Sequence, residues 1–141
     1  MDSNILQENI FFLAGALSRK LSKEADDAFA TVGLSHSHAL ILVLVEADPG
    51  IQPSSVAEQL SLQPSTITRL VQKLERRQLV ERESKGRATS IVCTAKGSNI
   101  AAEVRQKWEQ LLADKKEQLG DRYVNVLAEM IENALEAMDS G

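Results

Sequence analysis

The sequence predicts a mainly α-helical protein with one small β-hairpin. Over most of the 141 residues, apolar side chains recur with the period of a helix. Residues 79–94 differ, because apolar and charged residues alternate there and β-branched residues then dominate. Between residues 52 and 78, two short helical patterns are separated by only three residues, and the second has a basic outer face.

The first predicted helix runs from Asn4 to about Thr31. Its apolar residues lie on one stripe that needs a partner surface. Gly33 supplies the stop signal after it. The stripe begins with Ile10, Leu13, Leu17 and Leu21, and Phe11 and Phe12 widen it.

The second predicted helix is capped by Ser35 and runs to about Ala47. It is apolar nearly all round, so we expect it at the centre of the core. His36 and His38, the only histidines, are two residues apart and point to different faces, which makes a poor chelating pair. We expect His36 to face solvent and His38 to pack under the first helix; the functional alternative is that His38 lines a ligand pocket.

Two helices joined by a tight turn follow. The first covers residues 52–60, with Pro53 at its start and Ser55 and Glu58 at capping-box spacing. After residues 61–63, the second runs from Pro64 to Gln78, with an apolar stripe of Ile67, Leu70, Val71 and Leu74. Its other positions carry hydroxyls, amides and cations, which bond base edges and phosphates. Taken alone, this face equally suits an ordinary solvated helix. The order helix, tight turn and basic helix is typical of a helix-turn-helix.

A β-hairpin is predicted directly after this helix. Residues 79–84 and 89–94 form its strands, and Lys85, Gly86, Arg87 and Ala88 form a basic turn. A hairpin in this place is a wing, whose tip would lie near the neighbouring minor groove. Lys85 and Arg87 are the candidate contacts.

The chain resembles the MarR family of bacterial winged helix-turn-helix regulators. The resemblance spans residues 35–97 and rests on the motifs VAEQL, SLQPSTITRLVQKLERRQLVER, the wing with Arg87, and TAKG. Gln78 stands where the family pattern has glycine, which predicts a less sharply terminated helix. The wing is about three residues shorter than the family's and lacks its acidic residue, and Cys93 replaces a leucine.

The resemblance implies a dimer with two recognition helices in successive major grooves, about 34 Å apart on a pseudo-palindromic site. It also implies repression of a promoter and tuning by a small-molecule effector. The expected base-reading residues are Ser65, Thr66, Thr68 and Arg69. The expected phosphate-binding residues are Ser54, Ser55, Gln72, Lys73 and Arg76, with the free N–H groups at the start of the Pro53 helix.

Two further helices are predicted from Ala95 to the end, with a break near Leu119 and Gly120. The last has apolar residues at alternating spacings of three and four, as in a helical seam. We therefore expect an intertwined dimer rather than a monomer that folds these helices onto itself. The domains would be 1–34 (N-terminal dimerisation helix), 35–97 (DNA binding) and 98–141 (C-terminal dimerisation helices), in one compact protein. The candidate dimerisation residues are Ile10, Leu13, Leu17, Val124, Leu127 and Ile131.

The net charge of −4 is unevenly distributed. Residues 64–97 hold eight Lys/Arg and three Glu, net +5, so the rest of the chain carries −9. A basic island on an acidic body suits local phosphate binding. The single cysteine, Cys93, fits a reducing cytoplasm and is expected to be a small hydrophobe rather than a redox sensor. A basic leader and a run of 18 apolar residues are both missing, so we expect a cytoplasmic protein.

Enzymatic motifs are missing from the sequence. The serines have no paired base in a known motif, there is no glycine-rich phosphate loop, and Cys/His ligand spacings are absent, so no cofactor or metal is expected. Two classes remain: a DNA-binding regulator, and a winged-helix module that docks protein and no longer binds DNA. Arg69, Lys73, Arg76 and Arg87 favour the regulator, because a protein-docking surface does not need four cations there.

Overall fold

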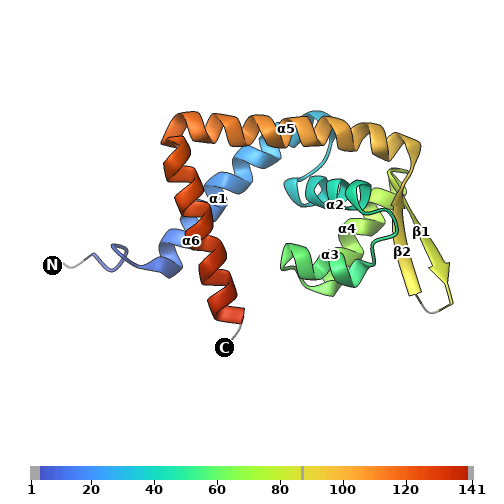
Figure 1. Ribbon diagram of the computed structural model, residues 1–141, viewed down its shortest axis with the longest axis horizontal. Helices are drawn as coiled ribbons and strands as arrows, with labels where there is room; N and C mark the ends of the chain where they lie inside the picture. The colour runs from blue at the N-terminus through green and yellow to red at the C-terminus, as the bar shows by residue number, and fades with distance from the viewer. Residues whose placement is uncertain (1–3, 87, 140–141) are drawn as a thin grey trace. The chain divides into compact units, whose positions relative to one another are not determined.

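The computed structural model describes residues 4–86 and 88–139 (Figure 1). The chain divides into two compact units, Met1–Arg105 and Gln106–Gly141. The fold is mainly helical with one antiparallel hairpin, as predicted. The elements are α1 (Ile10–Phe29), η1 (Ala30–Val32), α2 (His36–Ala47), α3 (Pro53–Leu60), α4 (Pro64–Arg76), β1 (Val80–Lys85), β2 (Ala88–Cys93), α5 (Ala95–Leu119) and α6 (Asp121–Asp139).

Helix α2 lies at the centre of the first unit, as its all-round apolar pattern predicted. It packs against α1, α4 and β2. The Ser35 side chain accepts the His38 N–H and caps α2. The core around α2 combines buried residues from every element of the unit except η1, including Phe29, Ile41, Leu42, Val45, Val56, Ile67, Val71, Leu74, Leu79, Val80, Ile91 and Val104.

Helix α1 is shorter than predicted at its N-terminal end. The prediction placed its start at Asn4, whereas the helix begins at Ile10. Glu8 has a left-handed backbone with φ 58°, which no helix continues through. Asn9 then caps the helix, because its side-chain oxygen accepts the Phe12 N–H at 3.1 Å. At the other end, α1 closes at Phe29 and a 3-10 turn reaches Val32.

Three helices of the first unit end in the same hydrogen-bond pattern, with one left-handed residue. At the end of α4, the Gln78 N–H bonds Glu75 O and the Leu79 N–H bonds Leu74 O, both at 2.9 Å. This is a Schellman motif, and Gln78 takes its left-handed place with φ 61°. The prediction that Gln78 would end the helix less sharply is therefore wrong. Gly33 and Ser61 occupy the matching places after η1 and α3.

The capping box predicted for α3 is absent. Gln52 is the N-cap and makes no side-chain cap bond, and Pro53 occupies the first turn. Ser55 therefore lies inside the helix, where its N–H bonds Gln52 O at 3.0 Å. The capping-box spacing was present, but its serine was three residues too late to cap.

The hairpin pairs Val80 with Cys93 and Lys85 with Ala88, one residue from the predicted strand limits. Ile51, in the link between α2 and α3, forms a bridge with Ile91. The Ile91 N–H bonds Ile51 O at 2.9 Å, and the Gly50 N–H bonds Ile91 O at the same distance. This bridge, which the sequence did not predict, anchors the wing to the core next to α2.

Helix α5 starts against the end of α4. The Thr94 hydroxyl accepts the Gly97 N–H at 2.9 Å and donates to Gln78 O at 2.7 Å. Gly97 packs so closely that a Cβ there would lie 1.9 Å from Leu79 O. The joint between wing and α5 thus depends on a position without a side chain.

The second unit contains the rest of α5 and α6. Within Asp121–Asp139, no residue is buried. Apolar side chains of α6 are left exposed, including Tyr123, Val126, Met130, Ile131, Leu135 and Met138. Among the described residues, no single helix is both long and apolar enough to cross a membrane; α1–η1 and α2 reach that length and composition only together, with a 68° bend between them.

Candidate DNA-binding surface

The apolar stripe of α4 packs into the core of the helix-turn-helix and leaves the other side of this helix on the surface. Ile67, Val71 and Leu74 are buried and Leu70 is half-buried. The Leu62 N–H bonds Ala57 O at 3.0 Å and closes the turn that joins α3 to α4. Because one stripe of α4 is fixed in the core, the opposite stripe is held outward in a defined orientation.

The outward stripe of α4 is polar and basic, as predicted. Ser65, Thr68, Arg69, Gln72, Lys73 and Arg76 are exposed, and Thr66 is half-buried. Glu75, the only acid of the helix, bonds Arg82 of β1 at 2.8 Å. Within the described part of the chain, no carboxylate lies within ion-pair distance of Arg69, Lys73 or Arg76. These charges are therefore available to a polyanion.

Several hydroxyls near this surface are partly engaged. The Thr68 hydroxyl donates to Pro64 O at 3.0 Å, so it can still accept a hydrogen bond and present its methyl group. At the start of α3, Ser54 is exposed and Ser55 is half-buried. The Ser55 hydroxyl accepts from Gln59 at 3.3 Å, and its N–H bonds Gln52 O. The Ser55 N–H is thus not free for a phosphate.

The wing lies beside α4 in the same unit. Val80 and Ile91 are buried at its base, and the Arg82–Glu75 ion pair joins β1 to α4. Gly86 has φ 64° in the turn. Arg87, predicted to enter the minor groove, lies outside the described residues. Lys85 is the last residue of β1, and its side chain lies outside the described part.

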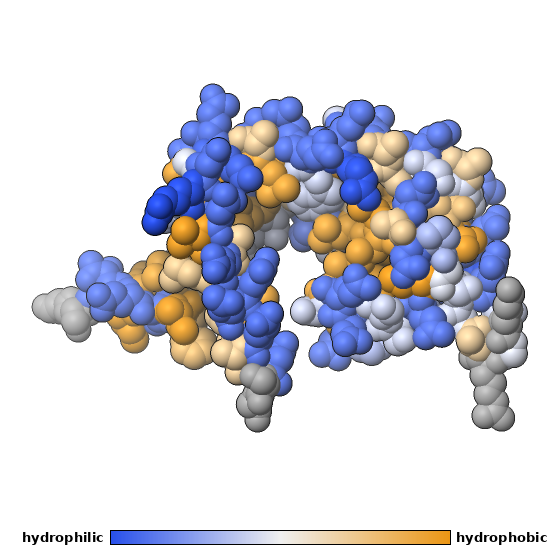
Figure 2. Space-filling view, in the orientation of Figure 1, coloured by the Kyte–Doolittle hydropathy of each residue, from blue (hydrophilic) through white to orange (hydrophobic). Residues whose placement is uncertain are grey.

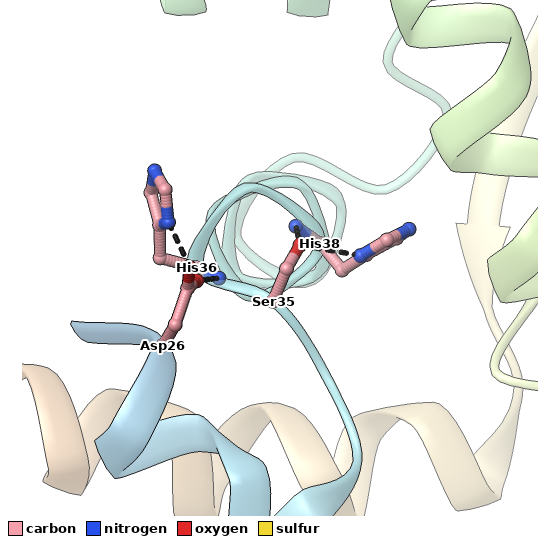
Figure 3. A network of polar contacts seen from close by, with 4 residues as sticks. All are labelled: Asp26, Ser35, His36 and His38. Carbon is pink, nitrogen blue, oxygen red and sulfur yellow. Dashed lines mark hydrogen bonds and ion pairs between the residues drawn. The ribbon is translucent and has the colours of Figure 1, made fainter. Parts of the chain in front are cut away.

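The two histidines point in opposite directions (Figure 3). One Asp26 oxygen accepts both the His36 N–H at 2.8 Å and its ring Nδ1 at 2.7 Å, so the ring proton is on Nδ1. His36 is half-buried and tied to α1 rather than fully solvated, and the pKa of Asp26 is lowered by these bonds. His38 is 7% exposed, and its Nδ1 lies 2.6 Å from Ser35 Oγ.

The environment of His38 disfavours its charged form. Burial lowers its pKa, and the cations Lys73 of α4 and Arg77, the C-cap of that helix, lower it further. An open depression of about 400 Å³ lies where α4, β1 and α5 meet. His38 is not among the residues that line it, which are Glu75, Gln78, Val80, Glu81, Thr94, Ala95 and Lys96.

Cys93 is half-buried at the end of β2. Burial, followed by the hydrogen bond and charge of Glu46, raises its pKa to about 12. The thiol therefore stays protonated at neutral pH, as a small hydrophobe would require. Within residues 4–86 and 88–139, no three His, Cys, Asp or Glu side chains are placed to hold a metal ion.

Arg77 is the one important cation that sequence reasoning missed. Its Nη1 donates to Gly33 O at 2.8 Å and its Nη2 donates to Val32 O at 3.0 Å. Both acceptors are backbone carbonyls more than 40 residues away, in the joint between α1 and α2. No spacing rule relates such a donor to its acceptors, so only the fold reveals the contact.

Comparison with known proteins identifies this arrangement. Residues 34–86, which run from the residue before the N-cap of α2 to the turn of the wing, match the model of the MarR family. This segment is a MarR family domain. Proteins of this family are transcription regulators and not enzymes, and the match supports a MarR-type transcription regulator.

Several known proteins are similar to this chain over nearly its whole length. The chain is 23% identical to the HTH-type transcriptional regulator SarZ of Staphylococcus epidermidis, over 99% of this chain and 90% of that protein. The fold resembles S. aureus MepR in a DNA complex, with a TM-score of 0.80, 18% identity and coverage of 90% and 96%. It also resembles Rhodococcus jostii RHA1 CouR bound to p-coumaroyl-CoA, with a TM-score of 0.77, 24% identity and coverage of 94% and 95%.

Proposed function

We propose that this regulator represses transcription by binding a pseudo-palindromic operator as a homodimer. The observation that carries the proposal is the outward stripe of α4, where three cations lack carboxylate partners among the described residues. Two such helices, one from each protomer, would enter successive major grooves about 34 Å apart.

Within each half-site, we expect α4 to contact base edges with one part of its length and phosphates with another. Residues of its first turns would reach base edges, and those farther along, with the start of α3, would hold phosphates. Arg69 offers a two-bond fit to guanine. The proposed base readers are Ser65, Thr66, Thr68 and Arg69; the proposed phosphate contacts are Ser54, Ser55, Gln72, Lys73 and Arg76; Lys85 and Arg87 of the wing would approach the minor groove.

The dimer is supported by apolar surface that one chain leaves uncovered. Ile10 is 72% exposed and Phe11 is 90% exposed. Figure 2 shows apolar side chains at the surface of the first turns of α1. Isolated chains rarely leave this much apolar surface in water. We assign dimerisation to segments 1–34 and 98–141 and DNA binding to 35–97; the contact residues would be Ile10, Leu13, Leu17, Val124, Leu127 and Ile131.

A small-molecule effector would tune the dimer. The support is the likeness in fold to CouR, which was solved with p-coumaroyl-CoA bound. His38, buried near the end of α1 and bordered by α4, is the side chain that we propose for an effector pocket. A protein of this function would act in the cytoplasm, where the DNA is.

The second candidate is a winged-helix module that docks a protein and has lost DNA binding. The unpaired cations of α4 argue against it. Binding of duplex DNA that weakens steeply with salt would exclude it, because phosphate contacts release counterions.

Two substitutions test the proposed roles within α4. An operator is first selected from random duplexes with the wild-type protein. Arg69→Ala should cost about 1–3 kcal/mol on that operator and leave most of the affinity for random DNA, because base contacts specify. Lys73→Ala should weaken both DNAs about equally and reduce the salt slope by about one.

The matched control is Arg105→Ala, which removes an exposed cation from α5. It should leave the operator affinity nearly unchanged. Equal weakening of operator and random DNA by Arg69→Ala would make Arg69 a phosphate contact. If the wild-type protein selects no DNA at all, the protein-docking alternative replaces the regulator's proposed mechanism.

A further inference from the structure

The end of α4 is a junction where three parts of the first unit meet. The Arg77 guanidinium holds the carbonyls of Val32 and Gly33, in the joint between α1 and α2. From the other side, Lys96 of α5 donates to Arg77 O at 3.3 Å and Thr94 donates to Gln78 O at 2.7 Å. The recognition helix is thus fixed at one end to the joint of α1 and to the start of α5.

The geometry of the joint makes this contact specific. Gly33 has φ 70°, and a Cβ there would lie 3.3 Å from Arg77 Nη1. Its left-handed backbone closes the Schellman motif in which the Leu34 N–H bonds Phe29 O at 3.2 Å. The two carbonyls are presented side by side to a planar donor pair, which suits the fork of Arg and not the single ammonium of Lys.

The same joint is held from the α1 side. Asp26 of α1 accepts the N–H and ring Nδ1 of His36, the first residue of α2. Figure 3 shows Asp26 reaching this end of α2. The α1–α2 joint is therefore held at two places, by Asp26 at the first residue of α2 and by Arg77, the C-cap of α4, at the carbonyls of Val32 and Gly33.

Arg77 itself does not belong to the outward stripe of α4. Arg76 is exposed on the outward stripe, whereas Arg77 is half-buried with its guanidinium on backbone carbonyls. We propose that Arg77 is a positioning residue that fixes the angle of α4 relative to α1 and α5, and thereby the operator spacing that the dimer accepts. This inference rests on the proposed dimer with two half-sites.

Operators of altered spacing test the inference. The wild-type protein first selects its operator from random duplexes, and duplexes are then made with the half-sites moved by one or two base pairs in either direction. Coupling between two sites of a protein typically changes affinity by about 5- to 150-fold, so Arg77→Gln should reduce the preference for the selected spacing by at least about fivefold. The spacing preference of Arg77→Lys should lie between those of the wild type and Arg77→Gln, because an ammonium keeps the charge and reaches one carbonyl well.

Arg105→Gln is the matched control, since it removes one exposed cation outside the junction. It should keep the full spacing preference. Equal weakening at every spacing by Arg77→Gln would overturn the inference, because Arg77 would then contribute only charge or stability. If Arg77→Gln does not fold, Arg77→Lys decides, and a wild-type spacing preference in that variant overturns the inference.

A distance measurement in the free dimer gives an independent readout. Glu58→Cys in a Cys93→Ser background places a spin label on exposed α3 of each protomer. The distance distribution between the labels should broaden when Arg77→Lys is added, and an unchanged distribution contradicts the inference. A wild-type protein that selects no operator would instead overturn the proposed function, whereas one that binds its operator at all spacings equally overturns only the inference.

Discussion

At the scale of single residues, close backbone approach decides what Gly97 must be. A Cβ at this position would lie 1.9 Å from Leu79 O and 2.8 Å from its carbonyl carbon. Both partners are backbone, and Leu79 is itself fixed in the Schellman motif of α4. The overlap cannot be relieved by rotating a side chain, so α5 or the wing base must shift.

Gly97→Ala should therefore lower the free energy of unfolding by about 3 kcal/mol, the upper end of the usual cost of overpacking. Gly15→Ala is the control, because a Cβ there meets only the flexible Arg19 guanidinium at 3.2 Å. In a helix interior, that change should stabilise by up to about 1 kcal/mol. Urea unfolding of both variants checks this, and equal stabilities would show that the joint adapts.

His38 gives the second residue-scale prediction. Its pKa is lowered from the ordinary 6.5 by burial and by Lys73 and Arg77. The unfolded chain therefore binds a proton on this ring more readily than the folded one. The stability from the neutral ring is present above pH 6.5 and is lost as the pH falls below it.

Urea unfolding at pH 7.5 and pH 5.5 should show a larger loss for the wild type than for His38→Asn, which keeps a side chain able to reach Ser35. A single site changes the stability by at most about 1.4 kcal/mol per pH unit. The lowered pKa of Asp26 acts only below its ordinary 3.8 and does not contribute in this range. Identical losses in both proteins would mean that His38 titrates alike in the folded and unfolded chains.

At the scale of elements, the hydrophobic periodicity of the sequence predicted those helix and strand limits that local packing controls. Helices α2, α4, α5 and α6 and the hairpin appear within two residues of their predicted limits, because each has a strong period or clear caps. The start of α1 was misplaced because Glu8 adopts a left-handed backbone, which its residue type does not signal. The prediction for the end of α4 was wrong for a related reason, because the Schellman motif forms there with Gln78 in place of glycine.

Contacts between distant elements were beyond the reach of the sequence. The Ile51–Ile91 bridge, the Gly97 approach to Leu79 and the Arg77 bonds to the α1–α2 joint each link segments with no shared period. The candidate DNA-binding face was predictable, because it depends only on which side of α4 is buried. The orientation of that face depends on the contacts of Arg77, and these contacts could be recognised only in the folded structure.

At the scale of the whole molecule, positive charge and exposed apolar side chains are concentrated in different segments of the chain. Residues 64–97 carry net +5 and the remainder −9, so DNA is attracted to one region and repelled elsewhere. Apolar exposure is concentrated in other segments, with Ile10 and Phe11 in α1 and Met130 and Met138 in α6 more than 60% exposed. This separation along the chain fits the proposed roles, in which one segment binds DNA and others bind a second copy of the chain.

The proposed dimer can therefore be tested by substitutions that leave the chain folded. Val124 and Leu127 are half-buried and Ile131 is 44% exposed, and no described residue of α6 is buried within the chain. Leu127→Asp combined with Ile131→Asp should then keep the helical circular dichroism and sediment as a 15.5 kDa monomer. Two linked half-site contacts gain on the order of 10²–10⁴ in avidity, so binding of the full operator should fall by at least about 100-fold.

Asn125→Asp combined with Asn133→Asp is the matched control. It adds the same two charges to α6 at exposed positions on the opposite side of the helix from Leu127 and Ile131. This variant should remain a dimer and bind the operator nearly as the wild type does, because a polar face of a helical seam tolerates charge. An intact dimer in the Leu127/Ile131 variant would place the interface on the exposed apolar part of α1 instead, and operator binding by a monomer would show that one recognition helix with its wing is sufficient.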